Sequence, residues 1–216
     1  VISRPGFADV SWYPVSVPTT VVSALVKLKH YPDPVFGMNL RQLPGVTYPI
    51  GDNFSNLPMR QDSPFMGPWW FRKSFALPAS YQGKTIWLYF GGINYRANIF
   101  LNGKQIGTYD DVAGAWRTYE FDITTAARPG AENVLALEVF SPTEKDLAIT
   151  FVDWNPAPPD KNMGLFREVE VRVSGPVRVR YPAVMTKLDS DQKAHLTVTA
   201  WLKNASKQNV SGQLKG

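Results

Sequence analysis

Two short segments combine polar and aromatic side chains in a way that suits the recognition of sugars. In residues 151–156, a strand-like run ends in Asp153 beside Trp154 and an asparagine. In residues 33–41, Asn39 stands in a loop rich in apolar anchors. Sugar rings offer C–H groups on their faces and hydroxyls on their edges, so aromatic and short polar side chains suit them. Structural roles in the core or in a turn explain the first segment equally well from composition, and explain Asn39 better.

No other arrangement of residues predicts a catalytic or metal site. The two histidines, His30 and His195, are far apart and neither stands at ligand spacing from a carboxylate. The common hydrolase, nucleotide and dinucleotide motifs are absent. Glycoside hydrolysis needs two carboxylates flanking one bond, but four glutamates stand at polar positions of alternating strands, which is typical of a solvated face: Glu120, Glu138, Glu168 and Glu170. We expect no metal, no cofactor and no catalytic residue in this chain.

Composition excludes several further classes of protein. The 216 residues are 44% hydrophobic, which suffices for a packed domain, and the absence of cysteine excludes disulfide scaffolds and thiolate zinc sites. The net charge of +5 arises in residues 178–216, which hold seven of the 23 Lys and Arg residues and two of the 18 Asp and Glu residues. Residues 1–177 are neutral, so we expect no nucleic-acid partner. No apolar run is long enough to span a membrane, and the first residues do not resemble a signal peptide.

Most of the chain has the pattern of short β-strands. Runs rich in aromatic and β-branched residues, bounded by Gly, Pro, Asn or Asp, predict strands at residues 69–77, 84–90, 94–101, 133–140 and 146–152. Residues 168–173 alternate strictly between polar and apolar types. Asn102-Gly103 predicts a tight hairpin, and Pro129-Gly130 a second turn. The sequence therefore predicts an all-β protein, an antiparallel jelly-roll β-sandwich.

Two segments depart from the strand pattern. Thr19 or Thr20 is suited to cap a helix over residues 21–28, with a buried strand as the alternative. Residues 32–68 contain seven prolines and four glycines, together with too many apolar residues for a disordered linker. We expect this long loop to pack across the sandwich.

The composition changes after Pro182. Residues 183–203 predict one or two strands, and a turn follows at residues 204–206. About 35 residues are too few to bury a sandwich core of their own. We therefore divide the chain into a β-sandwich over residues 1–177 and the truncated start of a second β domain over residues 178–216, and expect the chain to be a fragment.

The order of several motifs resembles the N-terminal, galactose-binding-like β-sandwich of glycoside hydrolase family 2. The resemblance covers essentially residues 1–177 and is carried by Val17-Pro18-Thr19-Thr20-Val21, Gly37-Met38-Asn39, Trp69-Trp70-Phe71-Arg72, Asn94-Tyr95-Arg96, Phe121-Asp122-Ile123-Thr124 and Gly164-Leu165-Phe166-Arg167. The tail resembles the first strands of the immunoglobulin-like sandwich that follows in the family. Residues 36–41 and 153–160 are most similar to the exo-β-D-glucosaminidase branch, because the β-mannosidase branch usually has Gly where this chain has Asn155.

The resemblance implies a retaining hydrolase that removes β-linked glucosamine from the non-reducing end of chitosan oligosaccharides. Its two catalytic carboxylates, about 5 Å apart, would lie on a barrel domain outside this chain, so the chain alone would be inactive. The resemblance also implies a secreted or periplasmic location. A β-mannosidase-like enzyme, a stand-alone carbohydrate-binding module and a purely structural sandwich remain alternatives.

The resemblance further implies that the first domain supplies one wall of the sugar pocket. Asp153 and Asn39 would lie near the terminal sugar, and Trp154 would stack on a sugar or support the loop. Asp160 is a further candidate, within reach of the same loop. The implied partners are a carbohydrate, the end of a glucosamine or mannose oligosaccharide, and the remaining domains of a longer chain.

Overall fold

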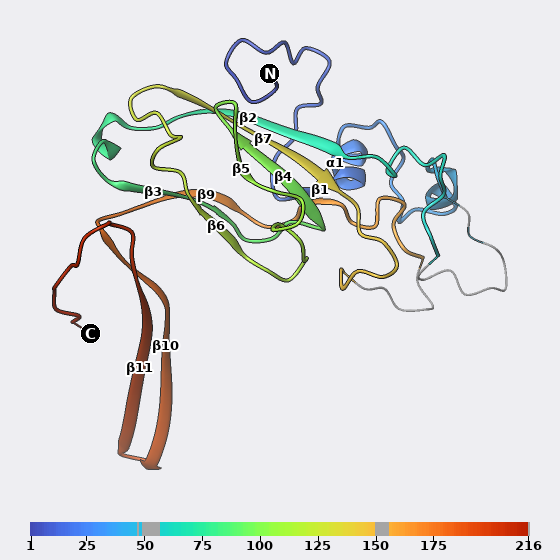
Figure 1. Cartoon of the computed structure of the whole chain (residues 1–216). Helices are drawn as coiled ribbons and strands as arrows, with labels where there is room; N and C mark the ends of the chain where they lie inside the picture. The colour runs from blue at the N-terminus through green and yellow to red at the C-terminus, as the bar shows by residue number, and fades with distance from the viewer. Residues whose placement is uncertain (47, 49–56, 150–155, 216) are drawn as a thin grey trace.

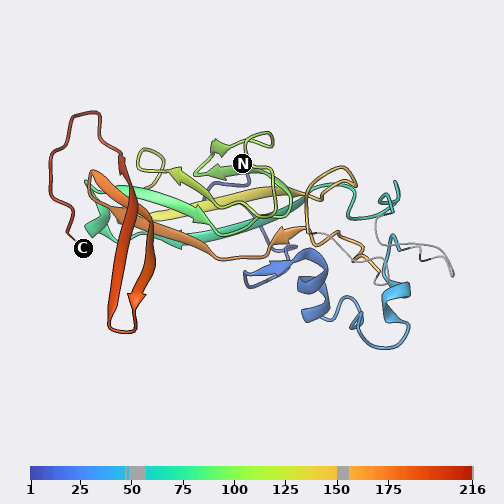
Figure 2. The ribbon, with the colours of Figure 1, turned by 90° about the horizontal axis from the view of Figure 1, so that it is seen from below.

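The protein is a β-sandwich with a hairpin attached, in a computed structural model that describes residues 1–46, 48, 57–149 and 156–215. The first sheet has the order β2-β7-β4-β5, with the bounds Trp69–Ala76, Glu132–Phe140, Arg96–Leu101 and Lys104–Gly107. The second has the order β6-β3-β9, with the bounds Tyr119–Asp122, Thr85–Phe90 and Val169–Ser174. All pairs are antiparallel, and Figures 1 and 2 show the two sheets as packed layers. The predicted all-β sandwich is confirmed.

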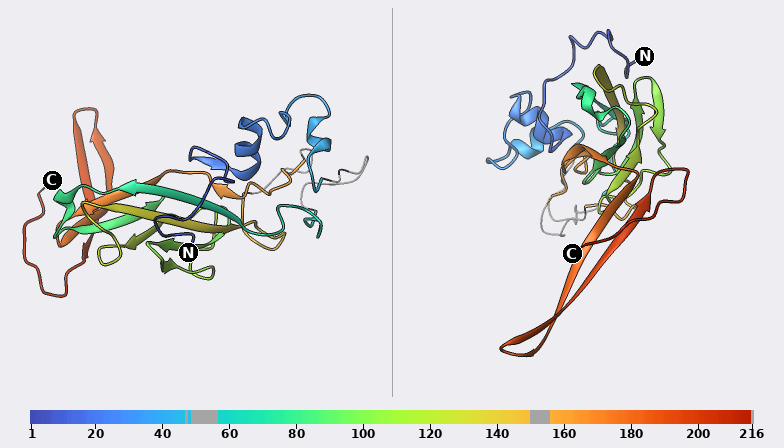
Figure 3. Two further views of the ribbon diagram at one scale, coloured as in Figure 1. Left: turned by 90° about the horizontal axis from the view of Figure 1, so that it is seen from above. Right: turned by 90° about the vertical axis from the view of Figure 1, so that its left-hand side faces the viewer.

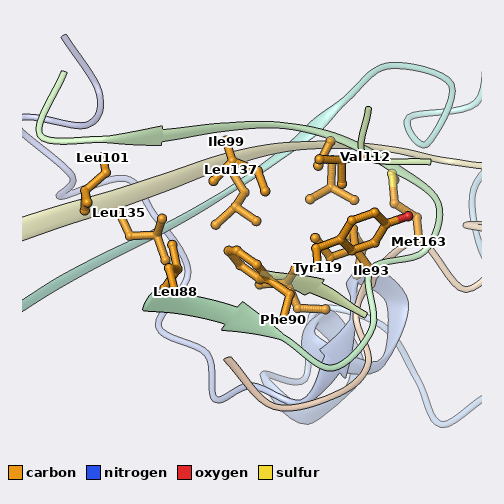
Figure 4. Close-up of a cluster of buried hydrophobic side chains, with 14 of the residues drawn as sticks. Leu88, Phe90, Ile93, Ile99, Leu101, Val112, Tyr119, Leu135, Leu137 and Met163 are labelled. Carbon is orange, nitrogen blue, oxygen red and sulfur yellow. The ribbon is translucent and has the colours of Figure 1, made fainter. Parts of the chain in front are cut away.

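The core lies between the two sheets because alternate side chains of each strand point inward. In β4, Ala97, Ile99 and Leu101 are buried while the residues between them are half-buried. Figure 4 shows inward side chains of both sheets meeting, among them Leu88, Phe90, Ile99, Leu101, Tyr119, Leu135 and Leu137, together with Val112 from the connection between β5 and β6. Full burial of each large apolar side chain stabilises the fold by about 1.5–3 kcal/mol.

The predicted turns and strands are present with one exception. Asn102 and Gly103 have φ angles of 53° and 86°, as the tight turn between β4 and β5 requires. The strand predicted at residues 146–152 is wrong for its described part, because residues 146–149 form no strand and have bends at Asp146 and Ile149. Asp146 accepts hydrogen bonds from the backbone N–H and the hydroxyl of Thr143, both at 2.9 Å. This local side-chain bonding competes with strand pairing.

The helix predicted near residue 21 is confirmed as α1 (Val21–Lys27). Thr20 caps it, since its hydroxyl accepts the backbone N–H of Ser23 at 3.2 Å. The helix follows β1 (Thr19–Thr20), which pairs with β8 (Gly164–Leu165). The long loop that follows packs on the sandwich as predicted, because Leu43 and Phe65 are buried in the main core. It contains the short 3₁₀ helix η1 (Asn39–Gln42), and a second, η2 (Ala79–Tyr81), joins β2 to β3.

Strands β10 (Val177–Ser190) and β11 (Lys193–Asn204) form a long hairpin that projects from the sandwich (Figures 1 and 3). Strand β10 begins where the sequence predicts the end of the first domain. Large apolar side chains on the hairpin are exposed, including Met185, Leu188, Leu196, Val198 and Trp201. A two-stranded hairpin is at best marginally stable alone in water, and within the described residues these side chains are largely uncovered.

Glu120 departs from the solvated position predicted for it. Its side chain is only 6% exposed, and its carboxylate lies 2.8 Å from Nη1 of Arg178 and 3.4 Å from Nε of Arg180. The ring of Trp87 contacts the same junction, with the Arg178 guanidinium 5.3 Å and the Lys203 ammonium 4.6 Å from its centre. Glu120 is therefore an anchor that joins the sandwich to the base of the hairpin.

Replacing Glu120 with glutamine is expected to loosen the hairpin while the sandwich stays folded. The substitution removes the negative charge that faces Arg178 and Arg180, and the hairpin should then detach about 5- to 30-fold more often, the equivalent of 1–2 kcal/mol. Limited proteolysis between residues 177 and 204 measures this opening. The matched control is Glu170→Gln, because Glu170 pairs with Arg172 at the exposed surface. Equal cleavage rates for the two variants would contradict the anchoring role.

Candidate functional site

Two loops meet at the end of the sandwich where α1 lies, opposite the end from which the hairpin projects (Figure 1). One is the long loop after α1, and the other connects β7 to β8. The hydroxyl of Tyr48 donates a hydrogen bond to the carbonyl of Ala157 at 2.5 Å, and the ammonium of Lys161 donates to the carbonyl of Leu57 at 2.5 Å. These contacts join segments that are 109 and 104 residues apart in the sequence. The long loop after α1 and the described end of the β7–β8 loop are thus joined.

Asn39 begins η1 and is half-buried. Its side-chain amide donates to the carbonyl of Asp33 at 3.0 Å, and its backbone N–H donates to the carbonyl of Phe36 at 3.2 Å. Two residues further on, Arg41 donates a hydrogen bond to the backbone carbonyl of Tyr48 at 2.6 Å. The hydroxyl of Tyr48 in turn donates to Ala157 in the β7–β8 loop. Asn39 therefore holds a turn that is connected to the β7–β8 loop.

Asp153 and Trp154 lie outside the described residues, but the chain is fixed on both sides of them. Before them, Asp146 pairs with Arg96 at 3.2 Å, and Ala148 is buried against Tyr95 and Ala115. Burial disfavours the charged form of Asp146, but the hydrogen bonds from Thr143 and Arg96 outweigh it and lower the pKa of this carboxyl. After them, Ala157 is buried and held by Tyr48.

The side chain of Asp160 is buried, and its carboxylate accepts hydrogen bonds from backbone N–H groups. One carboxylate oxygen accepts the N–H of Val22 at 2.8 Å, in the first turn of α1, and the other accepts the N–H of Asn162 at 2.9 Å. Burial raises the pKa of Asp160 to about 6, although these hydrogen bonds act in the opposite direction. With an exposed fraction of 0%, Asp160 has no surface with which to contact a sugar in this structure. It fixes the loop to the helix.

Asn94 and Gly164 also hold the β7–β8 loop, and with Asp160 they form what we call the frame of the site. The side-chain amide of the buried Asn94 donates to the carbonyls of Lys161 and Asn162, both at 2.9 Å. The backbones of Asn94 and Gly164 exchange hydrogen bonds at 2.9 and 2.8 Å. Gly164 has a φ of 151°, and a β-carbon there would lie 2.6 Å from the carbonyl oxygen of Thr19. Sequence reasoning missed both residues as parts of the site's frame, because no local pattern marks such a contact.

The described residues contain no group of three His, Cys, Asp or Glu side chains that could hold a metal ion. Within the same residues, the structure has no helix with the length and apolar character needed to cross a bilayer.

Comparison with known proteins finds similarity to several glycoside hydrolases, among them exo-beta-D-glucosaminidases and, at 30% identity over 94% of the chain, a mannosylglycoprotein endo-beta-mannosidase of Lilium longiflorum. The chain is 34% identical over 217 residues to an exo-beta-D-glucosaminidase of Streptomyces avermitilis, which it matches along 100% of its own length and 22% of that enzyme's. It is 33% identical to an exo-beta-D-glucosaminidase of Amycolatopsis orientalis, with 19% of that protein covered. The crystal structure of the exo-chitosanase CsxA from A. orientalis superposes with a TM-score of 0.81 at 33% identity, over 95% of this chain and 22% of that one.

These relatives are much longer than the chain, which spans about a fifth of the length of the curated proteins it matches. The family profile described as the glycosyl hydrolase 2 galactose-binding domain-like family matches residues 50–172. That range covers β2 to β7 and the loop held by Asn94 and Asp160. The match extends over more than half of the chain, and it agrees with the two-layered sandwich. The chain belongs to the galactose-binding-like domains of glycoside hydrolase family 2.

Proposed function

We propose that this chain is the non-catalytic part of a retaining exo-glycosidase acting on β-linked glucosamine, and that it forms one wall of the sugar pocket. The observation that supports the proposal is the hydrogen bond from Tyr48 to Ala157, which joins the long loop that contains Asn39 to the described end of the β7–β8 loop. The similarity to exo-beta-D-glucosaminidases supports the substrate class.

In the proposed wall, Asp153 accepts hydrogen bonds from sugar hydroxyls or pairs with the glucosamine ammonium. A charge-assisted contact of this kind contributes about 1.5–3 kcal/mol to binding. Asn39 lies near the same sugar, and Trp154 stacks on it or supports the loop. Asp160 acts through the loop, as a positioning residue.

The two catalytic carboxylates of the proposed enzyme lie on a barrel domain outside these residues, and the chain alone is inactive. The hairpin of β10 and β11 opens a second, immunoglobulin-like sandwich over residues 178–216 and beyond. Its exposed apolar side chains support this part of the proposal, since further strands would cover them. The proposed location is outside the cytoplasm, as the family resemblance implies.

Replacing Asp153 with alanine in the full-length enzyme is expected to lower kcat/KM for an aryl β-glucosaminide about 10- to 150-fold, which corresponds to the loss of one charge-assisted contact. Steady-state kinetics on the folded variant measure it. The control is Glu132→Ala, an exposed acid at the start of β7, at the far end of the sandwich, whose loss should leave kcat/KM within about twofold.

Two outcomes would contradict the proposal. A kcat/KM for Asp153→Ala within about twofold of wild type would indicate that the sandwich only positions the barrel. A preference of the full-length enzyme for an aryl β-mannoside would favour the β-mannosidase alternative. The binding-module alternative is tested by calorimetric titration of the 216-residue chain with glucosamine oligomers, where binding in the millimolar range or tighter would support an independent module.

A further inference from the structure

Trp116 lies on the loop that leads into β6, at the end of the sandwich where α1 also lies (Figure 1). Its exposed fraction is 66%. Isolated apolar residues on a protein surface are common and carry no function by themselves. Two observations set Trp116 apart from such residues. Its loop is held in place by the sandwich, and it lies next to the segments that flank the loop containing Asp153.

The loop is fixed on both sides of Trp116. The backbone N–H of Gly114 donates to the carbonyl of Tyr95 at 3.2 Å, and the carbonyl of Gly114 accepts the hydroxyl of Tyr119 at 3.1 Å. The guanidinium of Arg117 lies 5.2 Å from the centre of the Tyr119 ring. The backbone that presents Trp116 is therefore ordered before any ligand arrives, which lowers the entropic cost of binding.

The same loop contacts the chain on both sides of the segment that contains Asp153. Ala115, which is 1% exposed, packs in one apolar cluster with Ala148, which precedes that segment. The ring of Trp116 contacts the ring of Phe166, which follows β8, with 6.2 Å between their centres and 79° between their planes. This single ring contact supports the indole and leaves most of it exposed. Trp116 therefore lies at the base of the loop that contains Asp153.

We propose that Trp116 is an aromatic subsite that stacks on the second sugar unit of the oligosaccharide, on the leaving-group side of the bond to be cleaved. The C–H face of a sugar ring suits an exposed indole. Asp153 is five residues further along the chain than Ala148, so the two side chains engage successive units rather than the same one. The inference rests on the proposed function, which places the terminal unit beside Asp153.

A protein surface is a poorer occupant than a sugar. The centres of protein interfaces are contiguous apolar patches from which charged residues are depleted. Trp116 is followed by the exposed Arg117 and Thr118, and Phe166 by the exposed Arg167. The aromatic pair is therefore small and bordered by polar groups, which fits one sugar ring better than a broad protein contact.

Steady-state kinetics of the full-length enzyme on two substrates test the proposal. A glucosamine tetramer has sugar units on both sides of the cleaved bond, whereas methyl β-glucosaminide has only the terminal unit. Trp116→Ala should lower kcat/KM for the tetramer about 10-fold or more, through the loss of one aromatic contact. It should leave kcat/KM for methyl β-glucosaminide within about twofold of wild type. Trp116→Phe keeps a flat ring and should retain most of the activity on the tetramer.

The matched control is Leu147→Ala, which removes an apolar side chain that is 78% exposed beside Ala148. It should change kcat/KM for either substrate by no more than about twofold. Equal losses on both substrates from Trp116→Ala, or no loss on either, would overturn the subsite.

Asp153→Ala separates this failure from a failure of the proposed function. It should lower kcat/KM for both substrates, because both contain the terminal unit. If Asp153→Ala had no effect while Trp116→Ala impaired the tetramer alone, the subsite would stand and the role of Asp153 would fall. Hydrolysis of neither glucosaminide would overturn both proposals.

Iodide quenching of tryptophan fluorescence gives a second test. The difference between wild type and Trp116→Phe isolates the signal of Trp116 from the other tryptophans, of which this chain alone has six. In the free full-length enzyme, iodide should quench Trp116, and a sulfur-linked glucosamine dimer, which resists hydrolysis, should protect it. Absence of quenching in the free enzyme would show that another domain covers the indole and would overturn the proposal. Quenching that the dimer leaves unchanged would also overturn it.

Discussion

Replacing Gly164 with alanine is expected to destabilise the sandwich by about 2–5 kcal/mol, since backbone strain and a steric clash act together. The φ of 151° is one that L residues rarely adopt, and the new methyl group would lie 2.6 Å from the carbonyl oxygen of Thr19 and 2.8 Å from the α-carbon of Thr20. Both are backbone atoms of β1, so no side-chain rotation relieves the clash. Strand β1 or the loop before β8 must move.

The measurement is chemical denaturation of the 216-residue chain, followed by tryptophan fluorescence. The matched control is Gly175→Ala, at a position where a β-carbon meets nothing within 4 Å and φ is not in the left-handed region. The control should change the free energy of unfolding by less than about 0.5 kcal/mol. A Gly164→Ala variant as stable as the control would show that the β1–β8 contact is not required for folding.

The effect of this substitution should extend to the proposed pocket. Gly164 exchanges backbone hydrogen bonds with Asn94, whose side chain in turn holds Lys161 and Asn162. A shift at Gly164 would therefore move the loop on which Asp153 lies. In the full-length enzyme, kcat/KM should fall even at temperatures where the variant is folded, because positioning rather than stability alone is lost.

The sandwich and the helix were predictable because their signals are local. Alternating burial within β4 and the Asn102-Gly103 turn both follow from residues that are neighbours in the sequence. The cap of α1 likewise needs only Thr20 and the N–H three residues later. The strand wrongly predicted at residues 146–149 fails for a local reason too, since Asp146 binds back to Thr143.

The frame of the candidate site was not predictable, because its contacts join distant parts of the sequence. Asp160 and Val22 are 138 residues apart, and Asn94 and Lys161 are 67 residues apart. The burial of Glu120 similarly depends on the hairpin that reaches back to it. A charged residue in a strand is expected to face solvent unless a partner is known. The exposure predicted for Glu120 is therefore wrong, because its partner Arg178 is distant in the sequence.

Replacing Asp160 with alanine is expected to lower the free energy of unfolding by about 2–4 kcal/mol at neutral pH, because two buried backbone N–H groups, of Val22 and Asn162, lose their acceptor. The loss also removes the side chain that fixes the β7–β8 loop to the first turn of α1. Asp160→Asn keeps one acceptor oxygen and the shape of the side chain, so its cost should be smaller. Thermal and chemical denaturation of both variants measure the difference.

The pH dependence of these variants tests the electrostatics of Asp160. Burial holds its pKa at about 6 in the folded chain, against 3.8 ordinarily. Between these values the folded chain binds more protons than the unfolded chain, so the contribution of Asp160 to stability falls as the pH rises, by at most about 1.4 kcal/mol per pH unit. The stability of wild type relative to Asp160→Asn should therefore decrease from pH 4 to pH 6. An increase over that range would show instead that the hydrogen bonds from Val22 and Asn162 outweigh burial.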